Sequence, residues 1–424
     1  MIVPRHVVAA SGQTPPSERL NIAGIGIGGM GRGDLDAVAG QSHIVGLCDV
    51  DLVRGGETFQ KYPQAKPYRD FRRMLDDLES QIDAVVVATP DHTHAVAAIA
   101  AMQRGKHVYC EKPLAHSIYE VRQMMKTARE HKVVTQLGNQ GHSSDSIRSF
   151  CEWIWDGAIG QVHTIHAACG AVNSALDQLG RLSERHQVPS SLEWDLWLGP
   201  AAQRPYHPAF LPATWRRWTP FGNGTVGDWI CHVVDPVFWA LDLDAPSTIQ
   251  ARASNYDPKT QGLTFPTGEV ITYEFPAKGQ RGPVTLHWYS GTEKIQVEGV
   301  APDDLERTGA LVIGDKGMIV YGSHGAARVR LLPEERMRDY RQPPKKLPRV
   351  REHHRDWLEA IRQGTKAGSD FTYGGPLTEL GLLGVIAIRM LGAKLEWDSA
   401  AMRFKNNPEA NHWLNPPARR GWEV

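Results

Sequence analysis

The sequence predicts an α/β protein of two domains, the first built on a doubly wound parallel sheet and the second on a mainly antiparallel sheet. Three observations lead to this prediction. Apolar runs alternate with helical stretches over residues 20–138, an order that produces a parallel sheet covered on both faces. A glycine-rich turn follows the first run. After Gly138, strand-like runs succeed one another without intervening helices, which predicts antiparallel pairing.

The composition disfavours several classes of protein. Lys and Arg together number 47, as do Asp and Glu, so the net charge of zero indicates neither a nucleic-acid partner nor a membrane surface. No apolar run reaches the roughly 18 residues of a membrane-spanning helix. The five cysteines are scattered without a Cys-x-x-Cys pair, so we expect neither a disulfide framework nor a metal site.

Composition and periodicity divide the chain into four segments. Residues 1–19 form an N-terminal arm rich in Pro and Ser, and residues 20–143 form a dinucleotide-binding domain. Residues 144–405 form a substrate and oligomerisation domain, and residues 406–424 a tail rich in Asn, Pro and Trp. The tail is too irregular for a core element, so we expect it to wrap a neighbouring subunit.

A glycine turn opens the first domain. The apolar run from Leu20 leads into Gly26-x-Gly28-x-x-Gly31, the order of strand, tight turn and helix start that a dinucleotide-binding unit needs. Free N–H groups at the helix start then face the phosphates of the cofactor. Asp49 ends the second apolar run, near the position where an acid binds the adenosine ribose. A plain flexible loop is the alternative for so glycine-rich a stretch.

Polar side chains follow the later strands of this domain. Residues 82–88 form a short β-branched run, as expected of a strand covered on both faces. Residues 106–110 and 133–137 form the next two. Ligands bind at the carboxyl ends of parallel strands, so the segments that follow are predicted to line the cofactor edge. They are Thr89-Pro90-Asp91-His92-Thr93-His94, Glu111-Lys112-Pro113 and Gly138-Asn139.

The second domain is dominated by strand-like runs. Candidate strands cover residues 162–168, 248–254, 269–275, 284–289, 295–297, 310–313 and 318–321, and helical patterns cover residues 144–155, 353–362 and 377–391. Such an order predicts an α+β domain with a large open sheet. The uncovered face of that sheet needs a partner, so we expect a homo-oligomer, either a dimer or a tetramer.

Two motifs carry candidate catalytic side chains. Lys112, after a predicted strand, can place its ammonium beside a substrate oxygen, where it stabilises negative charge or moves a proton. In a helix, Asp228 and His232 share one face, and a histidine beside a carboxylate suits a general base. The alternatives are a surface lysine, a helix-capping aspartate and a buried structural histidine. A metal at this pair is the poorer interpretation, since no third ligand is evident.

Aromatic and basic side chains gather just before that helix. A Trp side chain offers a flat apolar face with a polar handle, which suits the C–H face of a sugar ring. Ordinary core packing is an equal alternative for any one of them. The cluster comprises Trp194, Trp197, Trp215, Arg216, Arg217, Trp218 and Trp229.

Taken together, these motifs resemble the glucose–fructose oxidoreductase, inositol dehydrogenase and MocA family (Gfo/Idh/MocA). The resemblance rests on the glycine turn, on Glu111-Lys112-Pro113 and on the Asp228-x-x-x-His232 pair, and residues 192–200 and 215–232 resemble a large bacterial branch. It covers essentially the whole chain from about Ser17. It implies a Rossmann domain, a C-terminal α/β domain with an open sheet, a nicotinamide cofactor and sugar-like substrates. Thr219-Pro220 departs from that branch, which affects the predicted substrate contacts and not the mechanism.

The resemblance also implies roles for single residues. Lys112 matches the family's active-site lysine, and Asp228 and His232 match its catalytic pair. Asp49 matches the ribose-binding acid and favours NAD, with NADP possible because Arg54 could reach a phosphate. The expected cofactor contacts are Gly26, Gly28, Gly29, Met30, Gly31, Asp49, Thr89, Pro90, His92, His94, Glu111, Lys112 and Asn139. The expected substrate contacts are Lys112, His142, Tyr206, Trp215, Arg216, Asp228 and His232.

The expected function is that of an NAD(P)-dependent oxidoreductase passing hydride between nicotinamide and a ring carbon of a sugar, sugar derivative or cyclitol. His232 is the expected general base, Lys112 polarises the reacting oxygen, and Asp228 holds an adjacent hydroxyl. Two alternatives stay open: a redox-neutral NAD-dependent glycosidase, and a non-catalytic sugar-binding protein on the same fold. The arm at residues 3–7 resembles the segment after a twin-arginine export signal, so both a periplasmic and a cytoplasmic location stay open.

Overall fold

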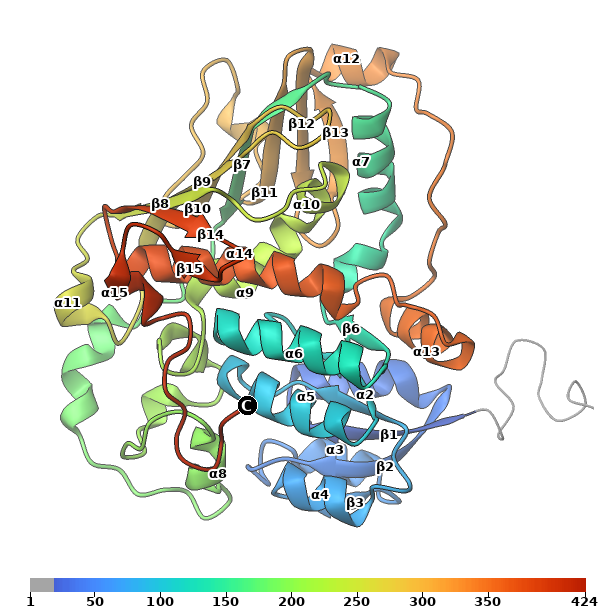
Figure 1. The fold of residues 1–424 in the computed structure, drawn as a ribbon, viewed down its shortest axis with the longest axis vertical. Helices are drawn as coiled ribbons and strands as arrows, with labels where there is room; N and C mark the ends of the chain where they lie inside the picture. The colour runs from blue at the N-terminus through green and yellow to red at the C-terminus, as the bar shows by residue number, and fades with distance from the viewer. Residues whose placement is uncertain (1–18) are drawn as a thin grey trace, which may run out of the picture.

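The first domain of the protein is built on a six-stranded parallel sheet (Figure 1). The computed structural model describes residues 19–424. The segment at residues 3–7 that resembles an exported arm lies outside the described residues. The strands are β1 (Leu20–Ile25), β2 (Ser42–Cys48), β3 (Lys66–Tyr68), β4 (Ala84–Val87), β5 (His107–Cys110) and β6 (Thr135–Leu137). Their order is β3-β2-β1-β4-β5-β6, and every neighbouring pair is parallel. The predicted doubly wound domain is confirmed. The order reverses between β1 and β4, where such sheets bind ligands.

Helices cover this sheet, and one of them, α13, belongs to the C-terminal part of the sequence. The local helices are α2 (Met30–Ala39), α3 (Gly56–Lys61), α4 (Phe71–Asp77), α5 (His94–Gln103) and α6 (Ile118–Glu130), the last begun by a Ser117–Glu120 capping box. α13 (His353–Gln363) packs on α2, and its Trp357 and Leu358 join the apolar core that α2 makes with β1. A segment that the sequence assigned to the second domain therefore completes the first.

A nine-stranded sheet forms the second domain. Its strands are β7 (Val162–Cys169), β8 (Thr248–Ala253), β9 (Gly268–Phe275), β10 (Val284–Gly291), β11 (Thr308–Gly314), β12 (Gly317–Gly322), β13 (Ala327–Leu332), β14 (Lys394–Asp398) and β15 (Arg403–Phe404). The order is β13-β12-β11-β7-β10-β9-β8-β14-β15, and β7 with β10 is the parallel pair in an otherwise antiparallel sheet. The predicted strand at 295–297 is wrong, because this stretch is a loop whose Val297 packs over Leu311 and Val320.

The long helix α14 (Phe371–Arg389) joins the cores of the two domains. Length and hydropathy alone would let it cross a membrane, but most of it is buried inside the protein. It packs against α6 of the first domain and against α9 (Gly224–Val233) and β8 of the second. Because α9 carries Asp228 and His232, this packing fixes the position of the predicted catalytic pair relative to the first sheet.

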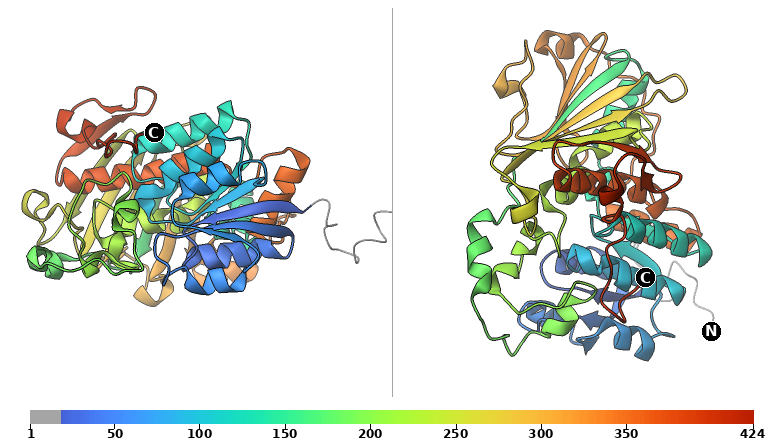
Figure 2. Two further views of the ribbon diagram at one scale, coloured as in Figure 1. Left: turned by 90° about the horizontal axis from the view of Figure 1, so that it is seen from below. Right: turned by 60° about the vertical axis from the view of Figure 1, so that its left-hand side comes forward.

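The C-terminal tail lies on its own chain. From α15 (Pro408–Asn411) it runs past α8 (Trp194–Leu198) to the first domain, as Figure 1 and the right-hand view of Figure 2 show. The side chain of Arg419 donates to the carbonyl oxygens of Gly199 and Asp195, at 2.9 and 2.7 Å. The tail that the sequence assigned to a neighbouring subunit thus packs here as a strap within one chain.

Candidate active site

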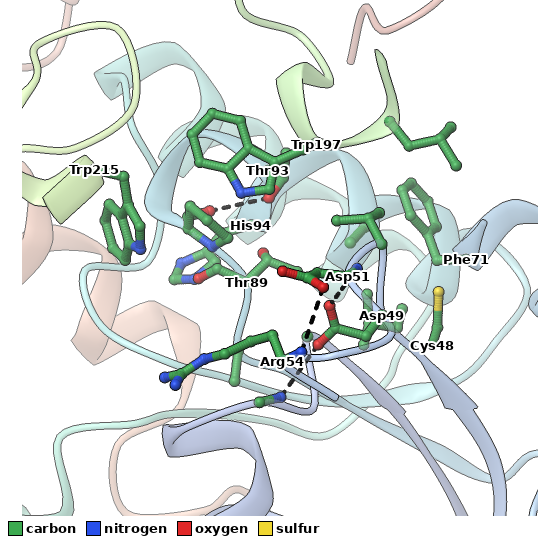
Figure 3. A pocket seen from close by; sticks show the side chains of 18 of the residues that line it. Cys48, Asp49, Asp51, Arg54, Phe71, Thr89, Thr93, His94, Trp197 and Trp215 are labelled. Carbon is green, nitrogen blue, oxygen red and sulfur yellow. Dashed lines mark hydrogen bonds between the residues drawn. The ribbon is translucent and has the colours of Figure 1, made fainter. Parts of the chain in front are cut away.

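A pocket of about 220 Å³ lies at the switch point of the six-stranded sheet (Figure 3). The loops that follow β1, β2, β4 and β5 form its floor, and parts of the second domain and of the tail form its roof. Predicted residues on its lining are Gly26, Gly28, Met30, Asp49, Thr89, Pro90, His94, Glu111, Lys112, Trp215 and Arg216.

The glycine turn is shaped so that backbone, and not side chains, faces this pocket. Gly26 has a φ of 77°, and an added Cβ would lie 2.7 Å from the backbone nitrogen of Thr89. An added Cβ at Gly31 would lie 2.0 Å from the carbonyl oxygen of Gly26, so only glycine lets α2 start directly on the turn. Such a cradle of backbone at a helix start fits the pyrophosphate of a dinucleotide.

Asp49, at the end of β2, holds the turn in place. Its Oδ2 accepts from the backbone N–H groups of Ile27 and Gly28 at 3.0 and 3.2 Å, and its Oδ1 accepts from that of Asp51 at 3.0 Å. Burial raises the pKa of Asp49 to about 6 in spite of these bonds. The Arg54 side chain lies across the turn and lines the pocket, where a cation suits a phosphate group.

Distant segments roof the outer end of the pocket. Leu192, Leu196 and Trp197 come from the second domain. This segment is hydrogen-bonded to the loop after β2, because the backbone N–H of Glu193 donates to the carbonyl oxygen of Val50 at 2.9 Å. Trp422 comes from the tail and is 8% exposed. Its ring lies 6.1 Å from that of Phe71 and 4.4 Å from the guanidinium of Arg72. The sequence interpretation missed Trp422, since nothing in the local pattern links it to a site.

The inner end of the pocket brings the two predicted catalytic motifs into contact. Lys112 Nζ donates to Asp228 Oδ1 at 2.8 Å and to the Asp228 carbonyl oxygen at 3.0 Å, and Arg216 Nε donates to the same Oδ1 at 3.3 Å. Burial works to raise the pKa of Asp228, but the charges of Lys112 and Arg216 hold it below its usual range. Burial works to lower the pKa of Lys112, but Asp228 and Glu111 raise it above its usual value. Both groups are therefore charged.

His232 lies one helical turn beyond Asp228, behind the residues of the lining. It is 5% exposed, and its ring stacks on that of His324 with centroids 4.2 Å apart. Nδ1 of His232 is buried without a hydrogen-bond partner among residues 19–424. Burial and then the Lys112 charge lower the pKa of His232 well below its usual value, so the ring is neutral. His324, in the turn before β13, was not foreseen.

Besides Asp228 and His232, six predicted contacts lie off the lining, and their binding roles stay predictions. Gly29 is the N-cap of α2, and Gly31 is the second residue of that helix. His92 is buried between Trp197 and Phe221, with its ring nitrogens 3.0 and 3.2 Å from their carbonyl oxygens. Asn139 and His142 contact the buried carboxylate of Asp235, at 3.2 and 3.0 Å. Tyr206 packs its ring against that of Trp194.

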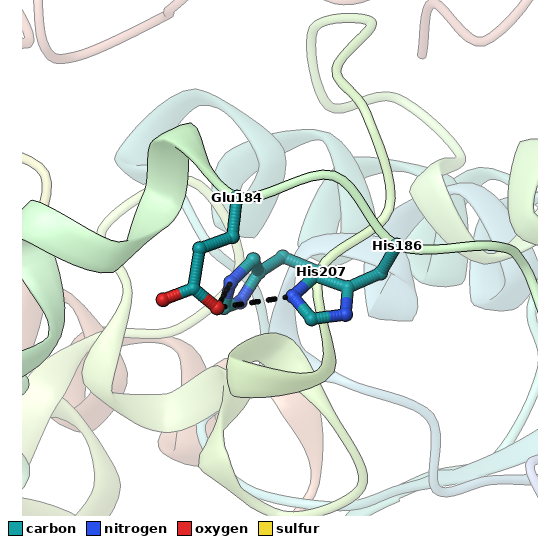
Figure 4. A group of neighbouring side chains, drawn as sticks. All are labelled: Glu184, His186 and His207. Carbon is teal, nitrogen blue, oxygen red and sulfur yellow. Dashed lines mark hydrogen bonds and ion pairs between the residues drawn. The ribbon is translucent and has the colours of Figure 1, made fainter.

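Within residues 19–424, one group of side chains has the spacing of a metal site: Glu184, His186 and His207 (Figure 4). Nδ1 of His207 accepts from the backbone N–H of Ala209 at 3.1 Å. In the neutral ring the proton is then on Nε2, the atom that faces the cluster, so no lone pair is available there for a metal. Oε2 of Glu184 lies 3.3 Å from Nε2 of His186 and 3.9 Å from Nε2 of His207, so the carboxylate pairs with the two rings and the group does not present three free metal ligands.

Two sequence profiles match the chain. Residues 20–139 match an oxidoreductase family described by its NAD-binding Rossmann fold, and residues 173–275 match that family's C-terminal α/β domain. Together they cover more than half of the chain.

Individual proteins extend the comparison. The levoglucosan dehydrogenase of Pseudarthrobacter phenanthrenivorans is 29% identical over 51% of this chain and 46% of its own length. The 2,7-anhydro-N-acetylneuraminate hydratase of Mediterraneibacter gnavus is 37% identical over 23% of this chain and 27% of its own. The chain thus spans less than half the length of these curated relatives. An inositol dehydrogenase homolog from Azotobacter vinelandii, solved with NAD+, shares the fold with a TM-score of 0.61 at 16% identity, over 91% of this chain and 99% of that one.

Proposed function

The chain belongs to the Gfo/Idh/MocA oxidoreductase family, and from that premise we propose that it is an NAD(H)-dependent oxidoreductase acting on a CH–OH group of a sugar, sugar derivative or cyclitol. The contact of Lys112 Nζ with the Asp228 carboxylate carries the proposal. It puts a cation, a carboxylate and a neighbouring neutral histidine at one end of a pocket whose other end is shaped for a dinucleotide. The relatives named as levoglucosan and inositol dehydrogenases support this choice of substrate class.

The glycine turn, Asp49 and Arg54 would hold the cofactor. When bound, the nicotinamide supplies the hydride acceptor or donor. A carboxylate beside the ribose favours the unphosphorylated ribose of NAD, because it would repel a 2′-phosphate. Arg54 is a nearby cation on the lining that could offset this repulsion, whereas Arg69 on the same lining is paired with Glu193. Tighter binding of NADP than of NAD would assign Arg54 that role.

The residues at the inner end of the pocket have different roles in proton transfer and charge stabilisation. Lys112, kept protonated by Asp228, is placed to stabilise negative charge that develops on the substrate oxygen. Asp228, kept ionised by Lys112 and Arg216, can accept a hydrogen bond from an adjacent substrate hydroxyl. His232, kept neutral by burial, can take the hydroxyl proton.

A redox-neutral reaction on a retained nucleotide is the second candidate. The relative named as a hydratase supports it, as does the roof over the outer end of the pocket, which would slow exchange of the cofactor. Release of nitrophenol from a nitrophenyl glycoside without added NAD would favour this candidate.

We also propose a homo-oligomer. On β10, Thr285, His287 and Tyr289 alternate with buried residues and face away from the helices, where His287 stacks on His166 of β7. This half-buried, aromatic face can pair with a second copy of the chain. Light scattering that returned the 47.0 kDa of one chain would contradict the proposal.

The main proposal is tested by absorbance at the NADH band with a panel of sugars and cyclitols. Saturable NADH formation is the expected result, and Lys112→Ala should abolish it. Lys106→Ala, which changes a half-buried lysine just before β5 and away from the pocket, should leave it intact. A protein that binds no nicotinamide nucleotide would instead be the non-catalytic alternative.

A further inference from the structure

A second cavity, of about 380 Å³, lies next to the nucleotide pocket and under the C-terminal tail. Its walls come from the start of α6, the end of α14 and tail residues 413–418. His92 lines this cavity, whereas its neighbours Asp91 and Thr93 line the nucleotide pocket, so one short loop separates the two spaces. Asn223 lines the second cavity and donates to Asp91 Oδ2 at 3.0 Å.

Two arginines face this cavity without a counter-ion. The guanidinium of Arg204 lies 5.1 Å from the ring centroid of Phe221, and that of Arg389 lies 3.8 Å from the ring centroid of Trp413. Within residues 19–424 neither side chain forms an ion pair or a hydrogen bond. Burial lowers the pKa of Arg389 to about 10 and also lowers that of Arg204. Both side chains are half-buried, and their ring contacts do not neutralise their charge. Charges partly removed from water without a counter-ion are costly, so the cavity is electropositive and short of an anion.

The acid on the cavity wall does not supply that anion. Glu120 Oε2 accepts from the backbone N–H groups of His116 and Ser117, at 3.1 and 2.8 Å, as part of the capping box of α6. Burial raises the pKa of Glu120 to about 7, so it carries only part of a charge near neutrality. Much of the rest of the wall is apolar, with Leu382, Val385, Ile386, Trp413, Pro416 and Pro417, and its other polar side chains are uncharged Ser, Thr, Asn and His residues.

We propose that this cavity binds a small organic oxyanion, a carboxylate or phosphate on an apolar body, with Arg204 and Arg389 as its partners. A guanidinium presents a planar fork of N–H donors that matches both oxyanions. The apolar wall accounts for the body of the ligand, and the tail residues close the cavity over it. The site is separate from the reaction proposed above and does not depend on it.

The test uses benzoate, phenyl phosphate and uncharged benzyl alcohol, with binding followed by calorimetry in the presence of saturating NAD. At least one of the two anions should bind saturably, and benzyl alcohol should not, because it lacks the charge. The anion that binds more tightly identifies the head group. Binding that is seen without NAD and lost at saturating NAD would place the probe in the nucleotide pocket and overturn the proposal.

Substitutions locate the site. Arg204→Gln and Arg389→Gln should each weaken anion binding at least about tenfold, the worth of a charge-assisted contact. Arg181→Gln, which changes an exposed arginine paired with Glu184, should leave the affinity unchanged. Arg389→Lys keeps the charge and should retain part of the affinity, which protects the test against a misfolded variant. Equal affinity in all four variants, or equal binding of benzyl alcohol, would overturn the proposal.

Discussion

The two ends of the nucleotide pocket are built in opposite ways. The inner end consists of charges that neutralise one another, with Lys112 and Arg216 on the Asp228 carboxylate. The outer end has a single buried carboxylate, Asp49, bonded to backbone N–H groups and roofed by apolar and aromatic side chains, including Trp422. The inner end is therefore rich in paired charges, and the outer end is enclosed by apolar and aromatic side chains.

This difference separates rate from affinity. On the proposed function, groups at the inner end would act on charge that develops during reaction, so their loss should lower turnover more than binding. Groups at the outer end would contact the part of the cofactor that does not react, so their loss should lower affinity more than turnover. Each of the following changes tests one side of that division.

Lys112→Ala should have the largest effect. It removes the cation of the inner end, and turnover should fall by about 10²–10⁴-fold, the usual worth of a positioned acid–base group. Nucleotide affinity should change far less. Steady-state rates and nucleotide titration on the same sample measure both, with Lys106→Ala as the control. A loss confined to nucleotide affinity would contradict the division.

Trp422→Ala should act at the outer end. Loss of a buried aromatic wall should weaken NAD binding by about tenfold and speed its dissociation, while the rate at saturating NAD stays close to that of the parent protein. Trp155→Ala is the matched control, because Trp155 lies on α7 (Asp145–Trp155) and is 45% exposed. Stopped-flow dissociation of NADH decides the matter. Equal dissociation rates for both variants would show that the tail does not contribute to nucleotide binding.

Acidification should weaken the outer end selectively. Burial raises the pKa of Asp49 to about 6, so its carboxylate takes up a proton as the pH falls through that value and accepts less well from the turn and from a ribose. Because the pKa of Asp49 is higher in the folded protein than in the unfolded chain, its protonation favours the folded state. Acidification through this pKa should therefore lower the affinity for the nucleotide and not the free energy of unfolding. Binding of ADP-ribose should fall several-fold between about pH 7.5 and pH 5, and Asp49→Asn should remove that pH step. A pH-independent affinity in the parent protein would exclude Asp49 from the contact.

Local sequence predicted the residues of the inner end because short motifs carry them. Lys112 follows a strand, and Asp228 is separated from His232 by one helical turn, so strand and helix periodicity place each motif. The parallel character of the first sheet and most strands of the second followed from the same patterns, whereas the strand order and the short β3 did not. The capping box at Ser117 can likewise be read from local sequence, because it is an interaction within four residues.

The outer roof and the second cavity could not be predicted in this way. They depend on where α8 and the tail pack, which is set by contacts between residues more than 200 positions apart, such as Arg419 with Gly199. The strand predicted at residues 295–297 was wrong for a related reason. Its Val297 side chain packs over the sheet, but the segment is not hydrogen-bonded into the sheet as a strand. Periodicity reports that a side chain is buried, not which surface buries it.

The central claim is that His232 acts as a base in a site shared by both domains, and His232→Ala tests it most directly when turnover and melting temperature are measured on one sample. The account predicts turnover lower by about 10²–10⁴-fold, with nucleotide binding nearly unchanged and a folded protein. A buried structural histidine would behave in the opposite way. A normal rate from a protein with a lowered melting temperature would contradict the assignment of His232.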